Sequence, residues 1–346
     1  MMKVLVVGVN TRPIANSLKR ANYYVCSVSY YAPEDLLADE IYYFINKDRH
    51  GKFSENYREE LLTRKVNEIH EEFDYILIGS GVFERENSKV YDWDNVLGTE
   101  PKKIKELSYK PRIYRELKRL GYEVPEFRVA KNYKDLEKFL DEFNKAVVKP
   151  PSGSGGFIRK ITSLDNLKNI KFPILIQELI EGKSFSANFI NNIFICYNKQ
   201  IIINGLYSGN RTPYPLNGEI WKKLLDIKEI FDIKGMWGVD FILKDNNVFI
   251  LDINPRLLGT FETIEMASKT NLSRALINNL EVKPKSTVIK RIVFSKRRVR
   301  AKIKPCKFVF DIPKFGAIIE KGEPLATVIA NRNLKSVIKK IYEWCI

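Results

Sequence analysis

Residues 235–256 read GMWGVDFILKDNNVFILDINPR, and this stretch decides the fold. Two apolar runs flank a polar segment at 244–247, which predicts two antiparallel strands joined by a turn. Asp240 interrupts the first run and Asp252 interrupts the second. A carboxylate inside an apolar strand is costly unless opposite charge compensates it. The pair therefore indicates a cation site on the hairpin.

The length of the turn decides whether the two aspartates meet. Partners in an antiparallel hairpin have residue numbers with a constant sum, so a two-residue turn sets Asp240 opposite Leu251. A three-residue turn at 245–247 sets Asp240 opposite Asp252 instead. Such a turn needs a left-handed residue, which Asn tolerates, so this register is open to the chain. We expect Asp240, Asp252 and Asn254 to project from one face of the hairpin.

Oxygen atoms on one face of a hairpin suit Mg²⁺, which also keeps several waters and substrate phosphates in its octahedron. We therefore predict a Mg²⁺ site at Asp240, Asp252 and Asn254, with Mn²⁺ as the alternative ion. The alternative without a metal is a pair of edge-strand carboxylates held in ordinary hydrogen bonds.

Residues 146–157 read AVVKPPSGSGGF, an apolar strand that runs into a glycine-rich loop. Backbone N–H groups of Gly and Ser can approach phosphate oxygens closely. No Gly-Lys-Ser or Gly-Lys-Thr follows, so the loop is not a Walker P-loop. The tip of a flexible hairpin would look the same, but Lys149 before the loop favours phosphate. We predict that phosphate binds at Ser152, Gly153, Ser154, Gly155 and Gly156.

These motifs, in this order, resemble the ATP-grasp superfamily, and the resemblance runs from about residue 110 to residue 256. It implies that the phosphates of ATP bind Lys110 and Lys149. It also identifies the paired aspartates and Asn254 as ligands of two Mg²⁺ ions, and Arg256 as the cation that stabilises the transition state. Several motifs in the order of a family are much more specific than any one of them.

The same resemblance implies where the nucleoside of ATP binds. Adenine recognition is expected from the segment ILIQELIEG, which contains Gln177, through backbone groups at Glu178 and Leu179. Many members carry an acid for the ribose where this chain has Ser184, so either Glu181 takes that role or the ribose is held in another way. Aspartate also replaces the glutamate common at both metal positions, which shortens each ligand by one methylene.

The length and the order of patterns predict three domains. At 346 residues the chain exceeds the usual size of a single core. Strands at Lys3–Val7, Val25–Ser29, Ile41–Phe44 and Tyr75–Ile78 alternate with helical segments such as Pro13–Arg20. We expect an α/β, doubly wound domain over 1–98, an α+β ATP-grasp domain over 99–283 (a central part at 122–183 and a C-terminal part at 184–283), and a small β-rich module over 284–346.

Composition narrows the class of protein further. The net charge of +16 could indicate nucleic acid, but thermophilic proteins and sites for anionic nucleotides are also rich in cations, so nucleic acid is not the ligand we expect. Four scattered cysteines and two histidines predict neither disulfides nor a zinc site, and point to the cytoplasm. No apolar run is long enough for a membrane helix. Whether the chain forms a homodimer is open.

The tail carries its own pattern. Arg298, Arg300, Lys302 and Lys304 alternate with apolar residues and predict a strand with one basic face. A solvated outer face is the interpretation we favour; an anionic acceptor or nucleic acid are the others.

The resemblance implies an ATP-dependent ligase that joins a carboxylate to an amine through an acyl phosphate. The chain is similar to predicted archaeal carboligases, which suggests a step in cofactor biosynthesis. One alternative is activation of bicarbonate, as in biotin carboxylases, and another is a nucleic-acid-binding protein with a degenerate nucleotide site. The sequence names neither the acid nor the amine.

Overall fold

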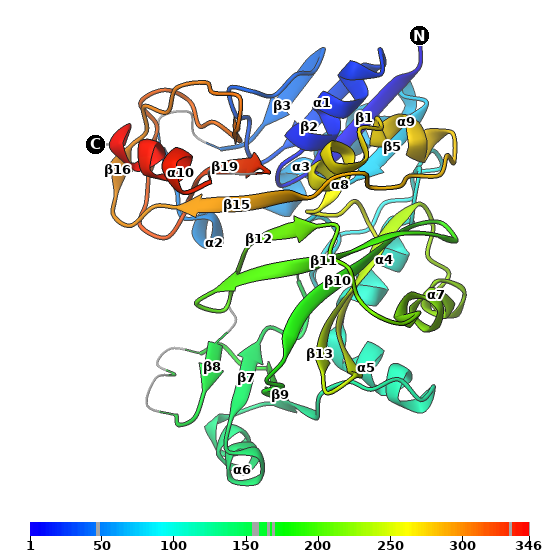
Figure 1. Cartoon of the computed structure of the whole chain (residues 1–346), viewed down its shortest axis with the longest axis vertical. Coiled ribbons are helices and arrows are strands. Elements are labelled where there is room, and N and C mark those ends of the chain that lie inside the picture. The colour runs from blue at the N-terminus through cyan, green and yellow to red at the C-terminus, as the bar shows by residue number, and fades with distance from the viewer. Residues whose placement is uncertain (46–48, 154–158, 165–166, 168–169, 332–333, 346) are drawn as a thin grey trace.

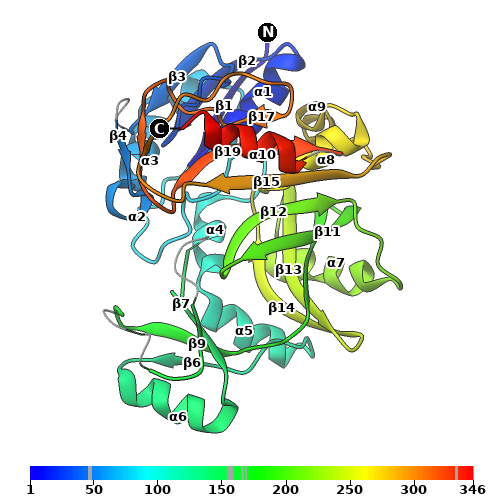
Figure 2. The ribbon, with the colours of Figure 1, turned by 60° about the vertical axis from the view of Figure 1, so that its left-hand side comes forward.

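The computed structural model describes residues 1–45, 49–153, 159–164, 167, 170–331 and 334–345. The predicted phosphate-binding positions Ser154, Gly155 and Gly156 lie outside these residues. Figure 1 shows the N-terminal domain at the top, a large sheet in the middle and a small subdomain at the bottom. Figure 2 shows the C-terminal strands and α10 (Leu334–Glu343) beside the N-terminal domain in a second view.

The N-terminal domain is a parallel sheet in the order β3-β2-β1-β5. Alternate side chains of β1 face opposite sides of this sheet. Val4 and Val6 pack in one core with residues of α1, whereas Leu5 and Val7 pack in another with residues of α3. Helices therefore cover both faces, and the predicted doubly wound arrangement is confirmed. The elements are β1 (Lys3–Gly8), α1 (Arg12–Arg20), β2 (Tyr24–Ser29), β3 (Glu40–Tyr43), α2 (Phe53–Asn56), α3 (Glu59–Ile69) and β5 (Tyr75–Ile78).

Two helices, α4 (Pro101–Ser108) and α5 (Lys110–Arg119), lead from this domain to the central subdomain. That subdomain is a four-stranded sheet in the order β6-β9-β7-β8, and α6 (Tyr133–Phe143) covers it. Its strands are β6 (Phe127–Ala130), β7 (Ala146–Lys149), β8 (Arg159–Ile161) and β9 (Ile174–Glu178). β7 pairs with β8 in antiparallel fashion, and the described loop residues Ser152 and Gly153 come shortly after β7.

The large sheet runs in the order β14-β13-β10-β11-β12-β15-β19-β17. Its apolar face packs against α4, α5 and α7 around the fully buried Trp237. Its other face is polar near α8, where Thr260 donates a hydrogen bond to Asn188. The elements are β10 (Lys183–Ile190), β11 (Ile193–Ile203), β12 (Leu206–Thr212), α7 (Ile220–Phe231), β13 (Met236–Lys244), β14 (Asn247–Asn254), α8 (Phe261–Ser268) and α9 (Leu272–Ile277).

The last 60 or so residues extend this large sheet, because β12 pairs with β15 and β15 pairs with β19. A second small sheet joins the tail to the N-terminal domain in the order β16-β18-β4. In the predicted basic strand only Val299–Arg300 forms a strand, yet Val299, Ala301 and Ile303 are buried as the alternation requires. The elements are β4 (Arg49–Gly51), β15 (Val288–Phe294), β16 (Val299–Arg300), β17 (Val309–Phe310), β18 (Ile318–Ile319) and β19 (Pro324–Ala330).

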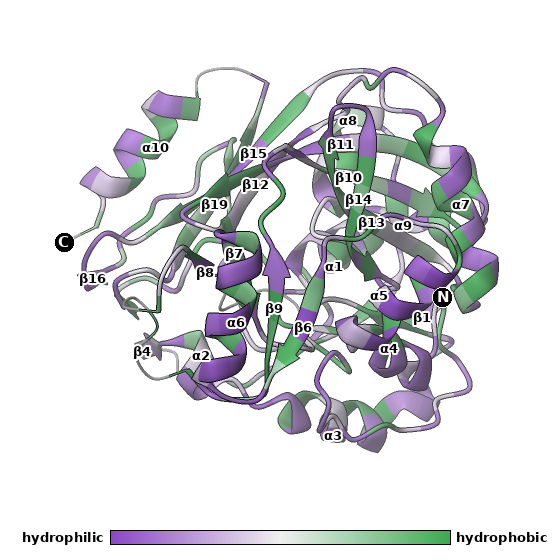
Figure 3. Cartoon of the chain, turned by 90° about the horizontal axis from the view of Figure 1, so that it is seen from below, coloured by the Kyte–Doolittle hydropathy of each residue, from purple (hydrophilic) through white to green (hydrophobic). Residues whose placement is uncertain are grey.

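The hydropathy pattern matches these layers. Figure 3 shows largely hydrophobic strands inside and helices such as α3 that alternate between hydrophobic and hydrophilic residues. A helix with one apolar stripe covers a sheet with that stripe. Within the described ranges, no helix has both the length and the apolar character needed to cross a bilayer.

Candidate active site

The hairpin of β13 and β14 brings the two aspartates together by a route that the sequence did not predict. Asp245 and Asn246 both have positive φ, at 49° and 68°, so the turn has two residues and the predicted three-residue turn is wrong. Leu251 is then an extra residue in β14, and the register shifts between Phe241 and Asp240. This β-bulge sets Asp240 opposite Asp252, which confirms the predicted pairing.

Asp240 lies in a hydrogen-bonded group on this hairpin. Its Oδ2 accepts from Asn254 Nδ2 at 3.1 Å, and its Oδ1 accepts from Gln200 Nε2 at 2.9 Å. Burial and the neighbouring charge of Asp252 raise the pKa of Asp240 to about 7. Where several oxygen ligands lie together without a cation, they oppose the ionisation of a carboxylate among them, and its pKa rises. Asp240, Asp252 and Asn254 therefore fit Mg²⁺, although the described residues contain no group of three or more His, Cys, Asp or Glu suited to a metal.

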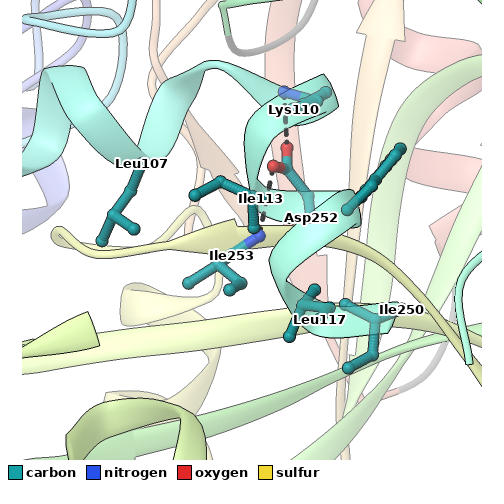
Figure 4. Close-up of a pocket in the computed structure, with 8 residues that line it drawn as sticks. Leu107, Lys110, Ile113, Leu117, Ile250, Asp252 and Ile253 are labelled. Atoms are coloured by element: carbon teal, nitrogen blue, oxygen red, sulfur yellow. Dashed lines mark hydrogen bonds and ion pairs between the residues drawn. The ribbon is translucent and has the colours of Figure 1, made fainter. Parts of the chain in front are cut away.

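Lys110 links Asp252 to the glycine-rich loop. Its Nζ lies 3.1 Å from Asp252 Oδ2 and donates to the carbonyl of Gly153 at 3.0 Å. Its backbone N–H also donates to the carbonyl of Pro151. Figure 4 shows Lys110 reaching from the start of α5 to Asp252 on β14, above apolar residues such as Ile113. A buried cation beside a carboxylate can exchange that carboxylate for another anion, such as a phosphate at the glycine-rich loop that we predicted to bind it.

Lys149 lies at the end of β7, as the sequence predicted, and is 8% exposed. Its Nζ donates to the hydroxyl of Tyr114 at 3.0 Å, and that hydroxyl donates to the carbonyl of Leu251 at 2.5 Å. Burial lowers the pKa of Lys149 to about 8, against the opposing effect of Asp252 and Asp240. Tyr114 thus connects the lysine to the bulge, a contact for which the sequence carried no signal.

Arg256 is held by a carboxylate of the N-terminal domain. Its Nε donates to Glu84 Oε1 at 2.6 Å, and its Nη2 donates to Asn254 Oδ1 at 2.9 Å. The arginine therefore adjoins the hairpin group, as expected, while paired with an acid that we had not predicted. The only available signal for Glu84 was its position shortly after β5, since ligand sites gather at the carboxyl ends of parallel strands.

The backbone of the segment predicted for adenine makes contacts within the protein. The N–H groups of Glu178 and Leu179 donate to the carbonyls of Glu126 and Lys145. Carbonyl acceptors at this edge remain compatible with the expectation. Gln177 is buried, and its Nε2 has no protein partner among the described residues.

Glu181, predicted for the ribose, lies on the surface. Its carboxylate pairs with Lys145 at 2.9 Å, and this contact lowers the pKa of Glu181. Ser152 and Gly153 lie in the described part of the loop, and Gly153 has the positive φ of 102° that favours glycine.

The family described as "ATP-grasp domain" matches residues 107–260, which contain every predicted site residue. An uncharacterized protein of the archaeon Methanocaldococcus jannaschii is 53% identical, over 99% of this chain and 92% of its own length. The chain belongs to the ATP-grasp family.

Other proteins are similar to this chain at lower identity. The large chain of the arginine-specific carbamoyl phosphate synthase of Geobacillus stearothermophilus is 24% identical over 59% of this chain, which corresponds to 23% of that protein. N5-carboxyaminoimidazole ribonucleotide synthetase from Thermotoga maritima is 16% identical, with a TM-score of 0.67 over 99% of this chain and 96% of that chain. Biotin carboxylase from Campylobacter jejuni is 15% identical, with a TM-score of 0.69 over 100% and 92%. These likenesses show the fold.

Proposed function

We propose that the chain is an ATP-dependent ligase that joins a carboxylate to an amine through an acyl phosphate. The observation that carries this proposal is the meeting of two buried lysines with the oxygen-rich hairpin. Lys110 contacts Asp252, and Lys149 is bonded to Tyr114 above the bulge that pairs Asp252 with Asp240. Buried cations beside carboxylates form a site for the phosphates and metal of a nucleotide.

The residues divide into phosphate-binding and metal-binding groups. Lys110, Lys149 and the loop at 152–156 would hold phosphate oxygens. Asp240, Asp252 and Asn254 would hold Mg²⁺, or Mn²⁺, and we propose two ions. The metal, when bound, neutralises charge on the transferred phosphoryl group. The raised pKa of Asp240 supports this assignment, because a divalent cation would favour its ionised form.

The reaction needs no covalent intermediate on the protein. A carboxylate oxygen of the substrate attacks the γ-phosphorus of ATP, the bond to the bridging oxygen breaks, and ADP leaves with that electron pair. The nitrogen of an amine then attacks the acyl carbon, phosphate leaves, and the nitrogen gives up its proton to solvent. Arg256 would stabilise the negative charge that develops in the transition state. Such preorganised electrostatic stabilisation is usually the largest single term in catalysis.

A second candidate keeps the site and changes the first substrate. Solved structures with this fold include biotin carboxylase, and relatives in sequence include carbamoyl phosphate synthase, so bicarbonate could replace the organic carboxylate. The cations and acids that meet at the proposed nucleotide site argue against the third possibility, a nucleic-acid-binding protein with a degenerate site. We further propose a cytoplasmic enzyme of cofactor biosynthesis; a homodimer remains to be tested by light scattering.

The test is release of ADP from MgATP in the presence of single acids from a library of amino acids and cofactor precursors. Hydroxylamine replaces the amine, so that any acyl phosphate is trapped as a hydroxamate. Hydroxamate with one acid, in buffer freed of bicarbonate, supports the ligase. ADP release that requires bicarbonate supports the second candidate, and failure to bind MgATP refutes both.

A further inference from the structure

Glu84 and Arg256 form an ion pair between two domains. Glu84 lies in the loop after β5 of the N-terminal domain, and Arg256 follows the metal-binding strand β14, 172 positions later. The two side chains are only 7% and 6% exposed, and 2.6 Å separates Arg256 Nε from Glu84 Oε1. A charge pair shielded from water at this distance has a defined geometry.

Each partner is fixed by further contacts. The N–H of Gly81 donates to Glu84 Oε2 at 2.7 Å, which sets the plane of the carboxylate. Arg256 donates from Nη1 to the carbonyl of Leu257 at 3.1 Å and from Nη2 to Asn254 Oδ1 at 2.9 Å. A guanidinium carries five N–H groups. With the bond from Nε to Glu84, three of these five have partners among the described residues, and the plane of the guanidinium sets the direction of the other two.

Glu84 is also close to the chemistry. It lines a small cavity together with Lys110, Gly153, Asp252 and Asn254. Nearby, the N–H of Leu257 donates to the carbonyl of Ile78 at the end of β5, which fastens the chain around Arg256 to the N-terminal domain. The N-terminal domain thus holds both the backbone and the side chain of the arginine.

We propose that Glu84 is a positioning residue that orients Arg256 toward the phosphoryl group. This inference rests on the proposed function. Without the carboxylate, the buried guanidinium loses its orientation and can turn toward the hairpin, where it already donates to Asn254, which in turn donates to Asp240. Loss of orientation affects the transition state more than ground-state binding of ATP, because the arginine is needed where charge develops.

The test compares two conservative Glu→Gln variants: Glu84 lies in the loop after β5, and Glu59, the first residue of α3, contacts the same loop. Glu84→Gln keeps the shape but cannot accept from both Gly81 and Arg256, because one side of the amide is a donor. Glu59→Gln is the matched control. Glu59 is equally buried, at 5% exposed, and accepts from the N–H of Phe83 and the hydroxyl of Ser88, but it has no contact with Arg256.

The readout needs no knowledge of the substrate acid. Calorimetry gives the affinity for MgADP alone and for MgADP with aluminium fluoride, which mimics the phosphoryl group in transfer. Aluminium fluoride should tighten the binding of MgADP about tenfold or more less in Glu84→Gln than in wild type. MgADP alone should bind to the variant within about twofold of wild type. Glu59→Gln should match wild type in both measurements.

A double-mutant comparison separates positioning from stability. In an Arg256→Lys background the planar guanidinium that Glu84 orients is absent. Glu84→Gln should then have little further effect on the affinity for MgADP with aluminium fluoride. The positioning role would be overturned if both Gln variants lost the same affinity for the fluoride complex, or if Glu84→Gln lost as much affinity in the Arg256→Lys background as in wild type. Neither outcome would contradict the binding of MgADP. A wild-type protein that does not bind MgADP would instead refute the proposed function, and this inference with it.

Discussion

Replacing Asp240 by Asn should stabilise the protein in the absence of metal. The folded pKa of Asp240 is about 7, against an ordinary value of 3.8, because burial and Asp252 oppose ionisation. This difference in pKa lowers the free energy of unfolding by about 4 kcal/mol at about pH 8 and by about 2 kcal/mol at about pH 5.5, because the unfolded chain ionises Asp240 more readily than the folded protein does. The amide in the variant loses one of the two hydrogen bonds from Gln200 and Asn254, which costs about 1–2 kcal/mol.

The net gain of Asp240→Asn is therefore about 2–3 kcal/mol at pH 8 and close to zero at pH 5.5. The sign follows from linkage: a folded pKa above the unfolded one means that stability is present at low pH and is lost as pH rises from about 4 to about 7. Thermal unfolding without metal should show a midpoint several degrees above wild type at pH 8 only.

The control is Asp245→Asn, the same chemical change in the exposed turn of this hairpin. It should leave the unfolding midpoint nearly unchanged at both pH values. Addition of Mg²⁺ with ATP should stabilise wild type and the control, but stabilise Asp240→Asn much less. A destabilised Asp240→Asn at pH 8 would refute the reasoning, because Asp240 would then be an ordinary hydrogen-bonded carboxylate.

Four further outcomes are expected. Arg256→Ala should bind MgATP but lose about 10²-fold or more in hydroxamate formation, and near-normal turnover would reduce the arginine to a structural ion pair. Lys149→Ala should weaken ATP binding by about 1.5–3 kcal/mol in calorimetry, whereas Lys145→Ala, at the exposed pair with Glu181, should not. The apparent affinity for Mg²⁺ should fall about tenfold for each pH unit below 7, since Asp240 must lose its proton to bind metal; a flat profile would exclude it as a ligand. Tyr114→Phe should lower the free energy of unfolding, measured by urea denaturation, by about 1–3 kcal/mol, because the carbonyl of Leu251 loses its hydrogen-bond donor. An unchanged value would mean that water replaces the hydroxyl.

The sequence determined the features that depend on neighbours along the chain. Periodicity and turn residues located β1, β5, β7 and the β13–β14 hairpin, because side chains alternate along a strand and Gly or Asn mark its ends. The types of residue at those places, acids within apolar strands and a lysine beside a glycine-rich loop, indicated a phosphate and a metal.

The tertiary structure alone decided which distant groups meet and how their chemistry changes. The bulge at Leu251 depends on how β14 fits its neighbours, so turn propensity gave the right pairing of Asp240 and Asp252 for the wrong reason. Glu84 reaches Arg256 from another domain, and no local pattern encodes a contact between residues 172 positions apart. The pKa of Asp240 follows from burial and from the charge that packing places opposite it, and neither quantity exists until the chain is folded.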